Sequence, residues 1–294
     1  MSFTSLQEIV KVCRQENINF AEAVLQNDCA ETKTDKELSF QRMTDMWDAM
    51  LFASANYEGS LKSSSGLVGG DGEKMEQFCK KNSGICGTFM DSVIAEALKM
   101  GESNACMKRI VAAPTAGSCG VMPAIIVPLY QKFRSSMPDI TDKIVKSFYV
   151  AAGIGQVIAL RASISGAEGG CQAEIGSASA MAAGALVFFY NGTPEQIIGA
   201  AGMALQNLLG LACDPVAGLV EVPCVKRNVI GAVNACSACD MALAGIYPVI
   251  PPDQIIDAMK EIGDKMHVSL RETGEGGLAA TEKGLKIKLS LLKK

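Results

Sequence analysis

Three cysteines lie in contexts that are rich in glycine, proline and charged residues. They occur in Gly169-Gly170-Cys171-Gln172, Ala212-Cys213-Asp214-Pro215 and Val222-Pro223-Cys224-Val225-Lys226. A thiolate that binds a metal must point at it from a fixed backbone, and prolines and glycines restrict or permit the geometry this requires. Three thiolates on a cubane iron-sulfur cluster would leave one iron open. Such an iron can bind a carboxylate and a hydroxyl and stabilise departing hydroxide as a Lewis acid.

Taken alone, these contexts fit a structural role equally well. Free cysteine is among the residue types most often buried, so the three could be small hydrophobic core residues. A disulfide framework is a poor explanation, because eleven cysteines is an odd number and the expected cytoplasmic setting keeps thiols reduced. Cys236 and Cys239 have the spacing of a redox pair but lie in an alanine-rich stretch, where we expect a packed helix.

The segments that must position these cysteines have helical patterns. Apolar residues recur at helical intervals in 6–13, 40–50 and 89–98, whereas alternating strand patterns are hard to find. No internal repeat and no clear linker divides the chain. We therefore expect an all-α fold, a mainly helical single catalytic domain over residues 1–294.

Several helix ends can be predicted from local chemistry. Ser5 is followed by Glu8 in capping-box spacing, and Thr193-Pro194-Glu195 supplies a cap, a fixed φ and a favourable dipole charge. Asp253 offers a further start after two prolines. Gly101 is placed to end the helix that precedes it.

Between these helices lie glycine-rich segments that we expect to form active-site loops. Glycine lets the backbone approach a ligand closely, and loops often carry binding residues. The polar stretch from Asp71 to Gly87 is expected to be a surface excursion. The glycine-rich segments are Ser63 to Gly72, Pro114 to Gly120, Gly166 to Gly176, Cys213 to Asn228 and Arg271 to Gly277.

Composition excludes several classes of protein. A chain of 294 residues with 49% hydrophobic residues can bury a large core, and a net charge of −4 with scattered basic residues argues against nucleic acid as a partner. Charged residues interrupt Met1 to Asn17, so we expect no signal peptide and a cytoplasmic protein. Ile175 to Tyr190 and Ile197 to Cys213 look apolar but contain many small or polar residues, so we expect buried helices and no membrane span.

The cysteines and the glycine-rich segments belong to longer sequence motifs. In chain order, the motifs resemble those of the α chain of bacterial iron-sulfur-dependent L-serine dehydratases, and the resemblance runs from about residue 60 to 280. Multi-residue matches of this kind are far more specific than a lone C-x-x-C. The matching segments are Ser63 to Gly66, Ala113 to Gly120, Gly166 to Gly176, Cys213 to Val216, Val222 to Asn228, Arg271 to Thr273 and Gly276 to Ala279.

The resemblance implies a helical catalytic domain that holds a [4Fe-4S] cluster on Cys171, Cys213 and Cys224. It implies conversion of L-serine to pyruvate and ammonia, with one iron as the Lewis acid and a base that removes the Cα proton. Whether a monovalent cation assists is left open. Pyridoxal phosphate is not expected, because we find no Schiff-base lysine paired with a glycine-rich phosphate loop.

The substrate's carboxylate and ammonium then need partners. Hydroxyl and backbone donors are our candidates, although serines can also serve merely as helix caps. Positive charge could come from Lys226 or Arg271, although long basic side chains are as often solvated or paired locally. The donor candidates are Ser63, Ser64, Ser65, Thr115, Gly117 and Ser118.

The base cannot be assigned from the sequence. His267 is the only histidine and has a suitable unperturbed pKa, but a lone histidine is more often structural. In the two-chain members that the sequence resembles, a separate β chain accompanies the α chain. We therefore expect a β subunit as partner, which could supply the base, together with assembly into an oligomer.

Two other functions remain open. A related cluster-dependent lyase that removes sulfide from L-cysteine would use similar chemistry, and a comparison of serine with cysteine would separate the two. A non-enzymatic iron-sulfur redox protein is the alternative of another class. It would leave the serine-rich segments unexplained.

Overall fold

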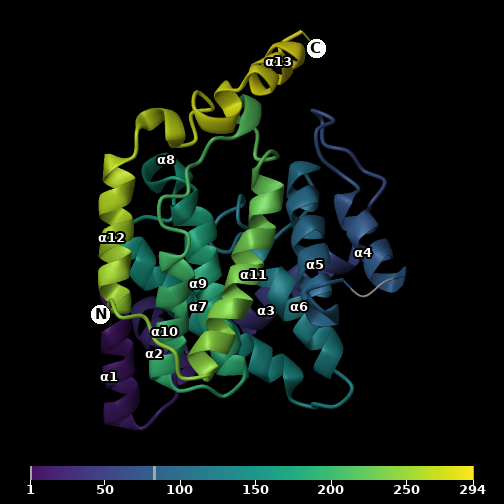
Figure 1. Cartoon of the computed structure of the whole chain (residues 1–294). Helices are drawn as coiled ribbons and strands as arrows, with labels where there is room; N and C mark the ends of the chain where they lie inside the picture. The colour runs from purple at the N-terminus through teal and green to yellow at the C-terminus, as the bar shows by residue number, and fades with distance from the viewer. Residues whose placement is uncertain (1, 82–83, 294) are drawn as a thin grey trace.

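The computed structural model describes residues 2–81 and 84–293. Within these ranges the chain forms thirteen α-helices and no β-strand, which confirms the all-α prediction (Figure 1). A single isolated β-bridge joins Cys213 to Arg271. The helices are α1 (Leu6–Glu16), α2 (Phe20–Thr32), α3 (Lys36–Ala55), α4 (Asp71–Lys81), α5 (Thr88–Ala105), α6 (Val121–Phe133), α7 (Ile140–Arg161), α8 (Gly166–Gly169), α9 (Ser177–Phe189), α10 (Pro194–Gln206), α11 (Cys224–Leu243), α12 (Pro252–Lys265) and α13 (Glu282–Leu291).

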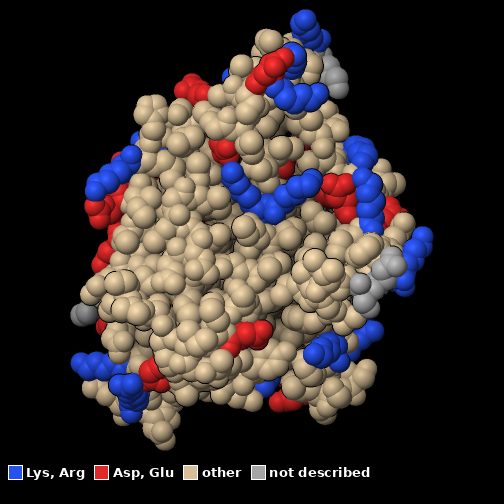
Figure 2. Space-filling model, in the orientation of Figure 1, with Lys and Arg blue, Asp and Glu red and all other residues tan. Residues whose placement is uncertain are grey.

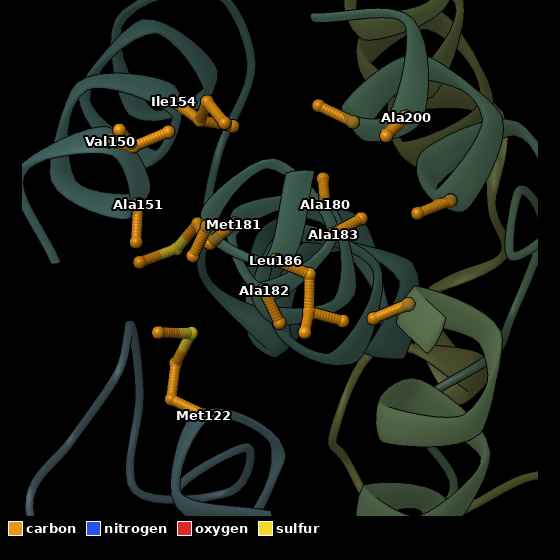
Figure 3. Close-up of a cluster of buried hydrophobic side chains, with 14 of the residues drawn as sticks. Met122, Val150, Ala151, Ile154, Ala180, Met181, Ala182, Ala183, Leu186 and Ala200 are labelled. Atoms are coloured by element: carbon orange, nitrogen blue, oxygen red, sulfur yellow. The ribbon is translucent and has the colours of Figure 1, made fainter. Parts of the chain in front are cut away.

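Helix α9 is the centre of the fold. All its residues but one are buried, and it packs against α6, α7, α10 and α11. Its small side chains allow this close packing: a Cβ on Gly184 would come within 2.2 Å of the Ile154 side chain on α7. Figure 3 shows the alanines of α9 between α7 on one side and Ala200 of α10 on the other.

Two predicted helix starts are confirmed in detail. The Ser5 hydroxyl accepts a hydrogen bond from the Glu8 amide at 3.1 Å, and Thr193 forms a complete capping box with Gln196. Asp253 lies in the first turn of α12, as expected, but its carboxylate accepts from the Leu6 amide at 2.8 Å. It therefore helps to cap α1.

The prediction that Gly101 ends a helix is wrong. Helix α5 continues through Gly101 to Ala105. The reason is packing, because a Cβ on Gly101 would lie 3.2 Å from the Cα of Val225 on α11. The glycine allows α5 and α11 to approach closely, and this contact positions the helix that begins with Cys224.

Two of the glycine-rich segments that we expected to form active-site loops contain helix. Gly166 to Gly176 forms α8 and a π-helical turn, Gln172–Gly176, which runs directly into α9. Cys213 to Asn228 contains the first turn of α11, which begins at Cys224. Glycine content predicts that the backbone comes close to a ligand or a neighbouring element, but burial of these two segments favours helical hydrogen bonds over an open loop. Asp71 to Gly87, which we expected to be a surface excursion, begins with α4, whose buried residue is Gly72; residues 82–83 lie outside the described part.

Of the two stretches that we expected to be buried helices, 175–190 forms the end of the π-helical turn and α9, whereas 197–213 is helical only to Gln206, where α10 ends. One described helix, α7, is long and apolar enough to cross a membrane, but 67% of its apolar window is buried in the protein. Contacts with α2, α3 and α9 identify α7 as a core helix. On the face shown in Figure 2, basic side chains lie in separate small groups with acidic side chains among them.

Candidate active site

The three predicted cluster cysteines are buried and come from three segments. Cys171 lies between α8 and the π-helical turn, Cys213 follows α10, and Cys224 is the first residue of α11. Their exposed fractions are 2%, 3% and 8%. Cys224 lies at the N-terminus of α11, where the helix dipole favours negative charge.

The cysteine side chains interact with one another. The Cys213 thiol hydrogen-bonds to Cys171, and this bond, together with the nearby Arg227 guanidinium, lowers the pKa of Cys171. The bond to Cys171 and burial raise the pKa of Cys213. Burial raises the pKa of Cys224 to about 12, with further contributions from Cys171 and Glu174. The structure thus brings all three predicted ligands to one place.

Arg227 holds the segment around Cys213 in position. Its guanidinium donates to the Ala212 carbonyl at 2.6 Å and to Asp214 Oδ1 at 2.8 Å, on either side of Cys213. The second oxygen of Asp214 accepts from the Leu278 amide at 2.7 Å. This ion pair is largely buried, so its hydrogen bonds are stronger than those of a surface pair.

The backbone of Cys213 is also fixed from the C-terminal side. Its N–H donates to the Leu270 carbonyl at 2.8 Å, and its carbonyl accepts from the Glu272 amide at 2.8 Å. Glu272 has a φ of 65°, in the left-handed region that non-glycine residues rarely adopt. Ligand atoms of Glu272, Glu174 and Cys213 all lie within 4.8 Å of one another.

The segment from Pro114 to Gly120 reaches the site through Thr115. The Thr115 hydroxyl donates to Glu174 Oε1 at 2.7 Å and lies 3.1 Å from the Ser118 hydroxyl. A Cβ on Gly117 would lie 3.1 Å from the same Glu174 oxygen. Three of our predicted substrate residues therefore gather around one carboxylate.

Asn228 connects this segment to the start of α11. Its side-chain oxygen accepts from the Gly120 amide at 2.8 Å. Its nitrogen donates to the carbonyls of Gly117 and Cys224, each at 2.9 Å. Only 1% of Asn228 is exposed, so the tie between Cys224 and the glycine-rich segment is shielded from water.

The donor set fits an iron-sulfur cluster. Iron-sulfur clusters are held by cysteine thiolates, and the three sulfurs come from rigid segments without forming a disulfide. A bound metal deprotonates thiols whose pKa is raised by burial, and Arg227 supplies compensating positive charge beside Cys171. Three ligands are available, so a cubane would keep one iron for another ligand.

The predicted serines lie close to the Cys224 segment but hydrogen-bond to an acidic residue. Ser63 and Ser65 both donate to Glu221 Oε2, the former at 2.9 Å. Ser64 is exposed. Glu221 is itself only 5% exposed, and it precedes Cys224 by one turn.

The predicted basic residues and the histidine are placed differently. Lys226 has a 74% exposed side chain and pairs with Asp71 at 3.2 Å. Arg271 lines a cavity of about 220 Å³ between α8 and α12, and its Nε has no hydrogen-bond partner among the described residues. His267 is exposed, and its Nδ1 accepts from the Ser269 amide at 3.2 Å. All three assignments to the site stay predictions.

Sequence reasoning missed four residues of this site. They are Glu174, Arg227, Asn228 and Glu272, and each lies inside a motif that had been singled out for its cysteines or glycines. Three of them were signalled by polar chemistry close to a ligand cysteine, since Glu174 and Arg227 lie three positions and Asn228 four positions after one. No sequence signal predicted the contacts that these residues make between segments far apart in the chain.

The comparisons with known proteins agree with this arrangement. The model of the family described as "Serine dehydratase alpha chain" matches residues 15–279. The chain belongs to this family. The resemblance predicted from the motifs is thereby confirmed, and with it the assignment to an enzyme family of L-serine ammonia-lyases.

Relatives cover almost the whole chain. The "Probable L-serine dehydratase, alpha chain" of Bacillus subtilis is 43% identical over 96% of this chain and 93% of its own length. The "L-serine dehydratase, alpha chain" of Peptoniphilus asaccharolyticus is 41% identical over 98% and 97%, respectively. The "L-serine dehydratase 1" of Escherichia coli is 36% identical over 94% of this chain but only 61% of its own length.

Proposed function

We propose that the chain is the catalytic α subunit of an iron-sulfur-dependent L-serine dehydratase, which converts L-serine to pyruvate and ammonia. The observation that carries this proposal is the meeting of Cys171, Cys213 and Cys224 in a member of this family. We also propose that residues 1–294 act as one catalytic domain. The continuous core to which α1–α3, α5–α7 and α9–α12 contribute supports that view.

The three cysteines would hold a [4Fe-4S] cluster. When bound, the cluster would supply a Lewis-acidic iron for the substrate's carboxylate and hydroxyl. Arg227 stabilises negative charge on the cysteine sulfurs through its contact with Cys171. The bond from Thr115 orients Glu174 toward the same region.

The chain's own residues would bind and orient the substrate, while the origin of the base stays a prediction. His267 is one candidate, and a group from a β subunit is the other. The names of the Bacillus and Peptoniphilus relatives, which are α chains, support a β subunit as partner. We further propose a cytoplasmic oligomer, and a monovalent cation as a possible activator.

Pyruvate formation from L-serine tests the proposal. The protein would be reconstituted anaerobically with iron and sulfide, with and without the β subunit, and L-cysteine would serve as the alternative substrate. We expect pyruvate and ammonia from L-serine, and no pyruvate with Cys213→Ser. The proposal is wrong if the wild type binds no iron and leaves serine unchanged with its partner present. Sulfide release from cysteine without serine turnover would support the desulfidase alternative.

A further inference from the structure

Two carboxylates face each other beside Cys213, and the proposed function has not used their charge. Glu174 comes from the π-helical turn after Cys171, and Glu272 comes from the segment that pairs with Cys213. Among the described residues, neither carboxylate takes part in an ion pair, since nearby Arg227 pairs with Asp214. Two carboxylates at this separation repel each other unless a cation lies between them.

The two carboxylates meet beside Gly166. A Cβ on Gly166 would lie 2.8 Å from Glu174 Oε2, 3.1 Å from Glu272 Oε2 and 3.2 Å from Cys213 Sγ. These three atoms therefore gather around Gly166, where a side chain would crowd Glu174. Glu174 is partly buried whereas Glu272 is exposed, so the pair lies at the boundary between the protein interior and solvent.

The orientation of Glu174 is fixed from the opposite side. Thr115 donates to its Oε1 at 2.7 Å, and this leaves Oε2 directed toward Gly166 and Glu272. Glu272 is held through its backbone, because its amide donates to the Cys213 carbonyl. The Glu174 carboxylate is thus oriented before any ligand arrives, which reduces the entropy cost of binding, and Glu272 is anchored beside it through its backbone.

We propose that Glu174 and Glu272 bind the α-ammonium group of an amino-acid substrate beside Cys213. An ammonium group has three donors and one positive charge, which match two convergent carboxylates. The inference rests on the proposed function and adds the part of the site that distinguishes an amino acid from a hydroxy acid. Both residues would contact the substrate directly without taking part in bond making or breaking.

A metal cation is the competing occupant. Glu174, Glu272 and Cys213 together have suitable ligand atoms for one. Cys213, however, is expected to be a cluster ligand, and two carboxylates alone are a sparse coordination shell for Mg²⁺ or Ca²⁺. The experiment separates the two occupants.

The test compares ligands with and without the ammonium group in the reconstituted enzyme with its β subunit. KM for L-serine and Ki for 3-hydroxypropionate, which is serine without its amine, are measured for wild type, Glu272→Gln and Glu174→Gln. Glu275→Gln is the matched control, because it changes an exposed glutamate in the same segment. Iron content and the visible spectrum check the cluster in each variant.

We expect KM for L-serine to rise about 10- to 100-fold in Glu272→Gln and Glu174→Gln, while Ki for 3-hydroxypropionate changes less than about threefold. Glu275→Gln should resemble the wild type. For a variant without turnover, calorimetry measures both affinities directly. If Glu174→Gln loses its cluster, Glu272→Gln still decides, since its side chain accepts no hydrogen bond from the described residues.

Three results would overturn the inference. Equal weakening of both ligands would mean that the carboxylates do not recognise the amine. An unchanged affinity ratio with an increased requirement for K⁺ or Mg²⁺ would assign them to a metal cation. No serine turnover by the wild type would reject the proposed function as well, whereas the first two results would leave it intact.

Discussion

Replacement of Asn228 by alanine should weaken both the fold and the retention of iron. Alanine removes the acceptor of the Gly120 amide and the donor to the carbonyls of Gly117 and Cys224. A buried donor without a partner costs about 1–3 kcal/mol, and each of the other two bonds contributes about 1 kcal/mol. We therefore expect the free energy of unfolding to fall by about 3–5 kcal/mol.

Asn234→Ala is a matched control on the same helix. Asn234 donates to Ser179 and to the Ala204 carbonyl, at 2.9 and 2.8 Å, and accepts from Asn207 at 2.9 Å. It thus makes the same number of bonds as Asn228, but these connect α11 to α9 and α10. Its loss should destabilise the protein without moving Cys224.

Two measurements separate the effect on stability from the effect on cluster retention. Denaturant unfolding of the chain gives the change in free energy, and anaerobic iron release to a chelator at a temperature where both variants are folded gives cluster retention. We expect Asn228→Ala to lose iron at least tenfold faster than Asn234→Ala. Similar rates, or a loss of stability below about 1 kcal/mol in Asn228→Ala, would refute the view that this amide positions Cys224.

Three further predictions follow from single residues. Cys224→Ala should prevent stable iron incorporation whereas Cys236→Ala should not, and iron analysis with the visible spectrum would show any reversal. Gly166→Ala should raise KM for L-serine more than tenfold, because its Cβ would lie 2.8 Å from Glu174 Oε2 and 3.2 Å from Cys213 Sγ; an unchanged KM would contradict the geometry. Thr193→Ala should lower the free energy of unfolding by about 1 kcal/mol, measured by denaturation, because it removes the capping box of α10.

Much of the helical architecture could be predicted because it depends on local chemistry. The caps at Ser5 and Thr193 are formed by residues three positions apart, and the apolar spacing of α1 reports its buried face. Gly101 shows the limit of this reasoning. A glycine can end a helix or permit another helix to approach, and only the position of Val225 distinguishes these cases.

The candidate site could be predicted only in part for a similar reason. Cys171, Cys213 and Cys224 lie in motifs long enough to identify a family. Glu174 and Glu272 become partners only through the bridge between Cys213 and Arg271, a contact between segments that sequence spacing does not connect. Long-range pairings of this kind follow from packing rather than from local propensity.

The backbone pairing at Cys213 also has a consequence for the order of assembly. Both of its hydrogen bonds go to residues of the 270–272 segment, which the ribosome produces after all three cysteines. A nascent chain therefore presents the complete thiol set before the last segment closes over it. A cluster donor would have its easiest access in that interval, and docking of this segment would complete the pocket around the inserted metal.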